Sequence, residues 1–353
     1  MRRLQIALSF LVLSLLLTAL WGCRKPAPPP KPTRGAELYG RMCAVCHGAN
    51  GEGYKADQAP RLAQADFQAT ATDEYLREAI KNGRTGTTMS AWFNDRGGPL
   101  SRDDIEELIH FMRTSWRKSP RPALDEHVNT GDVDRGENIY ARECSGCHGL
   151  KGVTGPALHI GNPQLLQTAT NGFLRYAIKH GRSGTQMPSF EQKLGDAGIE
   201  DVTALLRKWA SPPPPPPPPA PPPPIPLGPV PLNPHGPEPV GFKAQPGTTP
   251  VDVVHAQLER GARMALLDAR TPSDYMNEHI AGAVSVPFYD PTSYFAKLPK
   301  NAWLVCYCAC PHAESGTLAS KLVAAGFKKV TVLDEGLGVW RSRKYALKSG
   351  DKP

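Results

Sequence analysis

Two pairs of cysteines, each followed directly by a histidine, are the residues of this sequence best placed to do chemistry. They form the segments Cys43-Ala-Val-Cys46-His47 and Cys144-Ser-Gly-Cys147-His148. The Cys-x-x-Cys-His spacing is the attachment signature of haem c, in which both thiols bond to the haem and the histidine binds the iron. Zinc would need a further ligand nearby, and a redox Cys-x-x-Cys pair does not require the histidine. The sequence therefore predicts two covalently bound haem c groups.

The second axial position on each iron needs a ligand from further along the chain. Met89 and Met187 occupy matching places, each after a glycine-rich loop, and are the predicted ligands. Met42 and Met112 lack a counterpart and are interpreted as packing residues. Because His/Met ligation raises the haem potential and leaves no open coordination site, it favours electron transfer over peroxidase chemistry. His180 replaces Asn82 in the second copy and is interpreted as a surface residue.

The two motifs lie in an internal repeat, which predicts two copies of one domain over residues 34–118 and 132–210, joined by a connector over residues 119–131. The segments from Tyr75 to Met89 and from Phe173 to Met187 agree at 10 of 15 positions. Each copy ends in an amphipathic helical pattern, and in the first copy Ser101 is the predicted N-cap of that helix.

The order of an N-terminal helix, Cys-x-x-Cys-His, a methionine loop and a C-terminal helix resembles class I cytochrome c. The resemblance covers both repeats and implies all-α domains. It also implies that a proline carbonyl after each motif accepts the ring N–H of the proximal histidine, which fixes the ring as such partners do at metal sites. Pro60 and Pro156 are the candidates for this carbonyl.

Residues 245–353 show the alternation of an α/β domain. Short apolar runs at residues 265–269, 302–307 and 329–333 predict buried parallel strands, and residues 315–325 predict a helix. The segments around Asp268 and Arg270, around Cys308, and from Leu333 to Trp340 resemble the rhodanese domain. The resemblance implies that Cys308 carries sulfur as a persulfide, and that Asp268 and Arg270 support the loop that holds it.

The loop after Cys308 departs from the common rhodanese pattern. It lacks the arginine that related phosphatases need, which excludes phosphatase activity and weakens the case for thiosulfate as a donor. Glu314 is expected to repel such an anion, and Cys310 is placed to resolve a persulfide into a disulfide. Cys306 alternates with Cys308 along a strand and is interpreted as a buried thiol, and His312 as a proton donor or an ordinary loop residue.

The N-terminus predicts export. Arg2 and Arg3 precede an apolar run, which is typical of a signal peptide over residues 1–22, and Leu-x-Gly before Cys23 resembles a bacterial lipobox. Cys23 is the predicted lipidation site, residues 23–33 a tether, and the location the periplasmic side of a membrane. An uncleaved membrane-spanning anchor is the alternative. Residues 211–244 predict a stiff polyproline linker.

The net charge of +8 does not indicate nucleic-acid binding, because both repeats are neutral and no basic stripe with interleaved aromatic residues occurs. Three hypotheses remain. The chain transfers electrons between periplasmic or membrane redox partners; it is a sulfur-oxidising enzyme that takes an inorganic sulfur compound at Cys308 and passes electrons to the haems; or its rhodanese-like domain only docks a redox partner.

Overall fold

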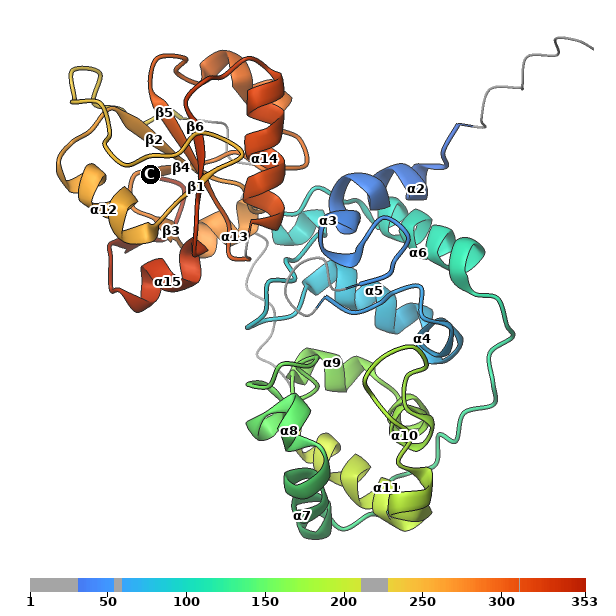
Figure 1. The fold of residues 1–353 in the computed structure, drawn as a ribbon. Helices are drawn as coiled ribbons and strands as arrows, with labels where there is room; N and C mark the ends of the chain where they lie inside the picture. Colours follow the sequence, from blue (N-terminus) through green and yellow to red (C-terminus); the bar gives the residue numbers. More distant parts are fainter. Residues whose placement is uncertain (1–30, 54–58, 211–227, 311) are drawn as a thin grey trace, which may run out of the picture. The chain divides into compact units, whose positions relative to one another are not determined.

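A computed structural model describes residues 31–53, 59–210, 228–310 and 312–353 (Figure 1). They form two helical regions, which contain the two repeats, followed by an α/β region. The predicted signal peptide, the lipidation site Cys23 and the proline run over residues 211–227 lie outside the described residues. Within the described ranges, none of the helices is both long and apolar enough to span a membrane.

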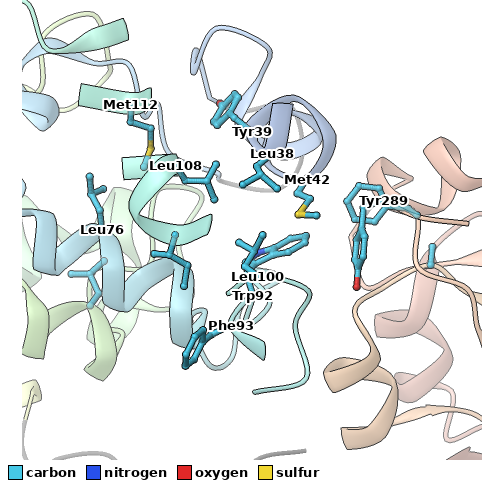
Figure 2. Packing of buried hydrophobic residues seen from close by; sticks show 14 of the residues in the cluster. Leu38, Tyr39, Met42, Leu76, Trp92, Phe93, Leu100, Leu108, Met112 and Tyr289 are labelled. Carbon is cyan, nitrogen blue, oxygen red and sulfur yellow. The ribbon is translucent and has the colours of Figure 1, made fainter. Parts of the chain in front are cut away.

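The first helical region is built from short helices around one core. Its elements are α2 (Arg34–Leu38), a π-helical turn (Tyr39–Cys43), α3 (Ala44–His47), α4 (Ala65–Thr70), α5 (Asp73–Asn82), a 3-10 turn (Asn94–Arg96) and α6 (Arg102–Trp116). Leu38, Met42, Leu108 and Met112 interdigitate where α2 and the π-helical turn pack on α6 (Figure 2). Both methionines are buried, as expected of packing residues.

The packing of α2 on α6 is unusually close at Gly35. A Cβ atom at this position would lie 2.1 Å from the carbonyl oxygen of Glu107, so only glycine permits the contact. The second region repeats this device: a Cβ at Gly136 would lie 2.2 Å from the carbonyl oxygen of Asp201. The two glycines of the repeat therefore set the distance between the first and last helices of each region.

The helix α6 begins at a capping box, as predicted. The Ser101 hydroxyl accepts the backbone N–H of Asp104 at 3.1 Å, and the Asp104 carboxylate accepts the backbone N–H of Ser101 at 3.1 Å. We expect Ser101→Ala to lower the unfolding free energy of this region by about 1 kcal/mol, because the first-turn N–H loses its partner. Urea unfolding followed by circular dichroism measures the loss. Ser115→Ala, on the exposed side of α6, is the matched control, and an equal effect in both variants would contradict the cap assignment.

The second helical region follows the same plan. Its elements are α7 (Val133–Glu143), α8 (Ser145–His148), a 3-10 turn (Leu150–Gly152), α9 (Pro163–Thr168), α10 (Asn171–His180) and α11 (Glu191–Trp209). The helix α11 is kinked at Gly195, which has a φ of 59°. The apolar residues predicted for this helix, among them Ile199, Val202 and Leu205, are buried. His180 lies exposed at the end of α10, as expected.

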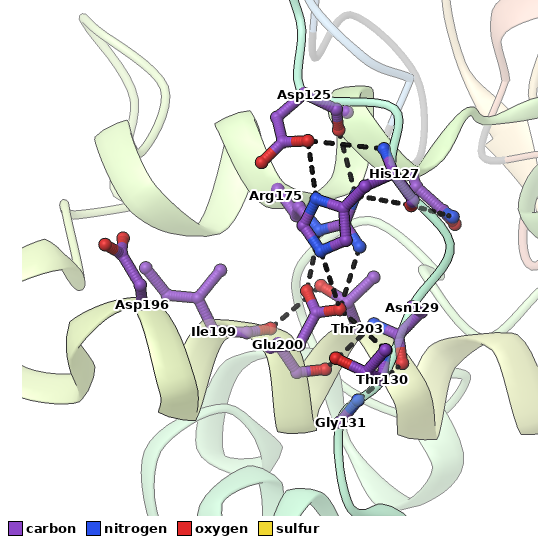
Figure 3. A network of polar contacts seen from close by, with 12 residues as sticks. Asp125, His127, Asn129, Thr130, Gly131, Arg175, Asp196, Ile199, Glu200 and Thr203 are labelled. Atoms are coloured by element: carbon purple, nitrogen blue, oxygen red, sulfur yellow. Dashed lines mark hydrogen bonds and ion pairs between the residues drawn. The ribbon is translucent and has the colours of Figure 1, made fainter.

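A charge network ties the segment before α7 to α10 and α11 (Figure 3). The Arg175 guanidinium donates to both carboxylate oxygens of Glu200, at 2.7 and 2.9 Å. His127 lies between two carboxylates, with its Nδ1 2.5 Å from Asp125 and its Nε2 3.1 Å from Glu200. The hydrogen bond to Asp125, reinforced by that to Glu200, raises the pKa of His127, and the hydrogen bond from Arg175 lowers the pKa of Glu200.

This network makes the stability of the second region depend on pH. A raised histidine pKa stabilises the fold fully below about pH 6.5, and the contribution is lost as pH rises through the folded-state pKa. The lowered pKa of Glu200 acts above about pH 4.3 and is lost as pH falls through its folded value. We therefore expect His127→Gln to lower the melting temperature most between these limits and least at alkaline pH. Thermal unfolding across pH tests this, with the exposed His110→Gln as control; a pH-independent effect would contradict it.

The α/β region contains a five-stranded parallel sheet in the order β1-β6-β5-β2-β4. Its strands are β1 (Thr248–Thr249), β2 (Met264–Asp268), β4 (Ala283–Ser285), β5 (Trp303–Tyr307) and β6 (Val330–Leu333). The strands β3 (His279–Ile280) and β7 (Leu347–Lys348) form a separate antiparallel pair. The helices are α12 (Val251–Glu259), α13 (Pro272–Asn277), α14 (Ala313–Ala324) and α15 (Gly336–Ser342), with a 3-10 segment at Thr292–Lys297. The three predicted strands and the predicted helix are confirmed as β2, β5, β6 and α14.

Both faces of this sheet are buried, which explains why its strands are continuous apolar runs. Leu304 and Cys306 belong to the core under α14, whereas Val305 and Tyr307 belong to the core under α12 and α15 (Figure 1). The expectation that Cys306 is a buried thiol is confirmed, because it is 0% exposed. The strand β5 is therefore packed on both faces, and Cys308 is the first residue after it, in the loop before α14.

Candidate functional site

Each predicted proximal histidine is held by a backbone carbonyl. His47 ends α3, and its Nδ1 donates to the carbonyl oxygen of Pro60 at 3.0 Å, as expected. His148 ends α8, but its Nδ1 donates to Leu158 at 2.9 Å, so the assignment of this role to Pro156 was wrong. The carbonyl lies 13 residues after the first histidine and 10 after the second, and this shorter loop presents a different residue.

The environment of both imidazoles suits metal ligation. Burial lowers the pKa of His47 and of His148, partly offset by the backbone hydrogen bonds, which favours the neutral ring. Since Nδ1 carries the proton and bonds the carbonyl, Nε2 is the nitrogen with a free lone pair. A neutral imidazole oriented by its other nitrogen is the usual arrangement of a metal-binding histidine.

A tyrosine in each repeat fixes the chain just after the motif. The Tyr39 hydroxyl donates to the carbonyl oxygen of Gly48 at 2.8 Å, and the Tyr140 hydroxyl donates to Gly149 at the same distance. Both glycines have positive φ and start the turn that leads to the carbonyl on the histidine. Sequence reasoning assigned these tyrosines no role, although they occupy matching positions four residues before the first cysteine of each motif. Their recurrence nine residues before the glycine was the available signal.

The loops that carry the two candidate methionines have the same hydrogen bonds. The Arg84 backbone N–H donates to the Met89 carbonyl at 2.9 Å, and the Arg182 N–H donates to the Met187 carbonyl at 3.0 Å. A threonine hydroxyl accepts each methionine N–H at 3.1 Å. Gly83 has a φ of 64°, and a Cβ there would lie 2.4 Å from the Met89 carbonyl oxygen. These loops place both methionines in half-buried positions with matching backbone geometry.

The arginine of each methionine loop packs on an aromatic ring. The Arg84 guanidinium lies 5.0 Å from the Tyr75 ring centroid, and that of Arg182 lies 4.7 Å from the Phe173 centroid. Nη2 of Arg84 is buried and has no hydrogen-bond partner within the described part of the chain. An unpaired buried donor has room for a partner that the polypeptide does not supply, such as a water or an anionic group.

The donor set therefore fits a covalently bound haem. Each motif offers two cysteine thiols, none of which forms a disulfide within the described residues, beside a buried imidazole whose lowered pKa favours the neutral ring. A thioether sulfur on a glycine-hinged loop is available in the same region, and a buried cation is present for a carboxylate group of the cofactor in the first region. These are the groups that haem c attachment and His/Met ligation need.

In each region an arginine of the last helix donates to backbone carbonyls of a neighbouring helix, and sequence reasoning missed both residues. Arg113 is buried and Arg207 is half-buried. Arg113 donates to the carbonyls of Gln68 and Ala71, at 2.9 and 2.7 Å. Arg207 donates to the carbonyls of Leu166 and Ala169, at 2.5 and 2.6 Å. These carbonyls lie at the C-terminal end of α4 in the first region and of α9 in the second. The arginine therefore supplies hydrogen bonds to that helix end and joins it to the last helix of the region. The amphipathic pattern of each C-terminal helix did not indicate that this arginine points toward the protein interior.

A separate cluster of reactive groups lies at the end of β5 in the α/β region. Cys308 and Cys310 are 1% and 2% exposed, and their Sγ atoms are 3.3 Å apart. The Ser315 hydroxyl lies 3.2 Å from the Cys308 sulfur, and the Glu314 carboxyl lies 4.0 Å from the Cys310 sulfur. His312 is not part of the cluster; it forms an ion pair with Asp334 at 3.2 Å.

The cluster makes Cys308 the more acidic of its two thiols. Burial alone would raise the pKa of Cys308, but hydrogen bonds from Cys310, from the Ser315 hydroxyl and from two backbone N–H groups lower it to about 7. The hydrogen bond to Cys308, with burial, raises the pKa of Cys310. These contacts favour the thiolate at Cys308 relative to Cys310, whose surroundings favour the protonated thiol.

Glu314 differs from its sequence-based expectation. It is 6% exposed, and burial together with the nearby Cys308 and two aspartates raises the pKa of its carboxyl well above the ordinary value. This shift favours the neutral acid, which weakens the repulsion of an anion that the sequence suggested. The sequence showed an acidic side chain in the loop, but not that the first turn of α14 buries it.

Asp268 and Arg270 form a buried pair at the end of β2, and within the described residues the hydrogen bonds of this pair do not reach the loop after Cys308. The Arg270 guanidinium donates to both Asp268 carboxylate oxygens, at 2.9 and 2.6 Å, and to the carbonyl of Glu278 at 2.6 Å. Both side chains are nearly fully buried. The pair links the end of β2 to the segment before β3.

Family comparisons agree with this division. Residues 30–112 and 131–206 match the family model of cytochrome c oxidase, cbb3-type, subunit III, and residues 250–343 match the rhodanese-like domain. The protein thus combines cytochrome c domains with a rhodanese-like domain. More particularly, its helical regions are cbb3-type cytochrome c domains, a family that carries covalently bound haem c, and the α/β region is a C-terminal rhodanese-like domain.

Among curated proteins, the cbb3-type cytochrome c oxidase subunit CcoP of Azospirillum sp. (strain B510) is 28% identical over 188 residues, which cover 48% of this chain and 58% of that protein. The subunit FixP of Bradyrhizobium diazoefficiens is also 28% identical, over 179 residues covering 47% and 57%. The chain thus spans little more than half the length of these relatives. A solved rhodanese-like domain from Anabaena sp. is 27% identical, covering 30% of this chain and 80% of that one, with a TM-score of 0.28.

Proposed function

We propose that this protein is a dihaem cytochrome c that transfers single electrons at the periplasmic face of a bacterial membrane. The observation that carries the proposal is the duplicated site: in both helical regions a buried histidine donates Nδ1–H to a backbone carbonyl, and a methionine loop has the same hydrogen bonds. The four motif cysteines would hold the two haems, with His47 and Met89 on one iron and His148 and Met187 on the other. The bound haem supplies a reversible one-electron couple with no vacant coordination site.

The residues of the chain contribute orientation. The carbonyl on each proximal imidazole fixes the tautomer of the ring, and the hydrogen bonds of each loop fix the backbone from which the methionine side chain extends. The proposed partners are redox proteins of the membrane, because the curated relatives are subunits of cbb3-type oxidases. Lipidation at Cys23 would keep the protein at that surface.

The stoichiometry of covalent haem tests the proposal. We expect the mature protein to carry two haems that survive denaturation, measured by intact mass and by the alkaline pyridine spectrum. Replacing Cys43 and Cys46 by Ala should remove one haem and leave the other, and replacing Cys144 and Cys147 should give the complementary loss. A single haem in the native protein, or no change in either variant, would refute the duplicated site.

A second candidate function belongs to the rhodanese-like domain. We propose that Cys308 carries sulfur as a persulfide and that the haems accept electrons released from the bound sulfur compound. The lowered pKa of Cys308 and the Ser315 hydroxyl 3.2 Å from its sulfur support this role. Because Cys308 is nearly inaccessible, the donor class would be a small, linear sulfane compound such as inorganic polysulfide.

Anaerobic stopped-flow spectroscopy of the oxidised holoprotein separates this enzyme from a docking module. We expect polysulfide to reduce the haems rapidly in the native protein and at least tenfold more slowly in Cys308→Ser, because the variant lacks the acceptor thiol. Thiosulfate, which is a bulkier dianion, should react more slowly with both proteins. Equal rates in the two proteins would leave the domain as a docking module for a redox partner.

A further inference from the structure

The buried cluster at the end of β5 contains a second thiol, that of Cys310. A persulfide carried on Cys308 alone gives this second thiol no role. Cys308, Cys310 and Glu314 present a sulfur, a sulfur and a carboxylate oxygen that all lie within 4.8 Å of one another. All three side chains are buried, and they come from the loop after β5 and the first turn of α14. The cluster therefore brings together a nucleophilic thiol, a second thiol and a carboxyl group that can carry a proton.

We propose that Cys308 and Cys310 are a redox-active dithiol in which Cys310 releases sulfide from a persulfide on Cys308, with Glu314 as the proton carrier. The inference rests on the proposed sulfur-carrying role of Cys308 but not on electron transfer to the haems, because here the two cysteines supply the electrons and the sulfur is reduced. The substrate class is a small sulfane compound, and the product class is hydrogen sulfide. The domain is then a sulfane reductase rather than only a carrier.

The geometry favours bond formation between the two sulfurs. Their separation of 3.3 Å must shrink by about 1.3 Å to reach the length of a disulfide bond. The two residues are separated by one residue, and the Cys308 sulfur also lies 2.8 Å from the Cys310 carbonyl oxygen. Leu337 donates its N–H to the Cys308 carbonyl at 3.0 Å, and a Cβ at Gly336 would lie 2.9 Å from the same oxygen.

Glu314 is placed to carry the proton that each step requires. Its carboxyl lies 4.0 Å from the Cys310 sulfur. Burial and the negative groups around it, Cys308, Asp268 and Asp274, favour the neutral acid, while Arg270 opposes this. A neutral carboxylic acid can protonate a leaving thiolate and then, as a carboxylate, accept the proton of a neighbouring thiol.

The two steps balance as follows for a persulfide donor R–S–SH. The Cys308 thiolate attacks the terminal sulfur; a bond from Cys308 to sulfur forms, the donor S–S bond breaks, and Glu314 protonates the leaving R–S⁻. Glu314 then removes the proton of Cys310, whose thiolate attacks the Cys308 sulfur and displaces HS⁻. The sulfane sulfur gains two electrons and becomes sulfide, and the two cysteines lose two electrons and form a disulfide. An external dithiol reductant resets the pair by thiol–disulfide exchange.

The experiment follows the cysteines directly and does not depend on haem reduction. The reduced full-length holoprotein is mixed anaerobically with a small excess of inorganic polysulfide, quenched with an alkylating agent and digested with trypsin. One tryptic peptide, residues 301–321, contains Cys306, Cys308 and Cys310. In the native protein we expect a disulfide between Cys308 and Cys310 and about one sulfide released for each disulfide. In Cys310→Ser we expect a stable persulfide on Cys308, seen as one added sulfur atom.

Two further variants complete the design. Glu314→Gln should slow disulfide formation by about a hundredfold, the size expected when a proton carrier is lost. Cys306→Ala removes the third thiol of the peptide, which lies outside the cluster, and should leave both products unchanged. Equilibration of the native protein in dithiothreitol buffers provides a readout free of mutation, because a Cys308–Cys310 disulfide should form in one two-electron step.

The outcomes separate this inference from the function on which it rests. A persulfide that accumulates equally in the native protein and in Cys310→Ser, without a disulfide, would overturn the resolving role and leave Cys308 as a sulfur carrier. The absence of a persulfide in Cys310→Ser together with the absence of a disulfide in the native protein would overturn the carrier role itself. A disulfide that forms at the native rate in Glu314→Gln would overturn only the role of Glu314.

Discussion

Replacing Met89 by His is expected to lower the midpoint potential of one haem by on the order of 100 mV, within the ~0.8 V range that axial ligands span. The physical reason is that a thioether stabilises the reduced iron more than an imidazole does, so exchanging the ligand favours the oxidised state. Spectroelectrochemical titration of the holoprotein resolves this shift. The potential of the other haem should stay unchanged, because its own ligands are retained.

The chain offers matched controls for this measurement. Met187→His should shift the other haem and spare the first, which tests the equivalence of the two loops. Met112→Leu replaces a methionine buried in the first core and should shift neither potential. If Met89→His leaves spectrum and potential as they are in the native protein, then Met89 is not the ligand, and the clamped loop has another task.

Replacing Arg270 by Met is expected to destabilise the rhodanese-like domain by about 3–5 kcal/mol, the usual effect of leaving one charge of a buried pair alone. Asp268 is 0% exposed and would lose both hydrogen bonds from the guanidinium. Hydrogen–deuterium exchange of the amides in β2 and β5 measures the loss for this domain separately from the helical regions. The free energy of opening that exchange reports for those amides should fall by about 3–5 kcal/mol.

An exposed ion pair on the same domain is the control. Arg343 donates to Asp252 at 3.2 Å, and both side chains are 55% exposed. Arg343→Met should therefore change exchange by less than about 1 kcal/mol. Equal protection in the native protein and in Arg270→Met would show that the carboxylate of Asp268 is stabilised by something other than the arginine.

The sequence predicted those parts of the fold that depend on local periodicity and on repetition. The capping box at Ser101, the strands β2, β5 and β6 and the helix α14 follow from hydrophobic spacing and turn residues. The candidate histidines and methionines emerged because they recur in both copies. Recurrence did not identify the carbonyl on His148, because the two loops differ in length and the accepting residue depends on the path of the backbone.

The cluster around Cys308 shows where sequence reasoning stops for a physical reason. Cys308 and Cys310 were recognisable as a possible pair, but their separation depends on loop dihedrals that no pattern encodes. Glu314 was assigned the wrong electrostatic role, because an acidic residue at the start of a helix is usually exposed and ionised. Its neutral form results from burial, a tertiary effect of packing α14 on the sheet.

The clamped methionine loops have a kinetic consequence for an electron carrier. Gly83 and Gly181 lie so close to the methionine carbonyls that a Cβ atom at these positions would come within 2.4 and 2.5 Å of the carbonyl oxygen. A ligand held in one place by the polypeptide costs little reorganisation at the moment of transfer. We therefore expect these loops to keep the reorganisation energy low, so that distance and encounter with the partner would limit the rate of electron transfer.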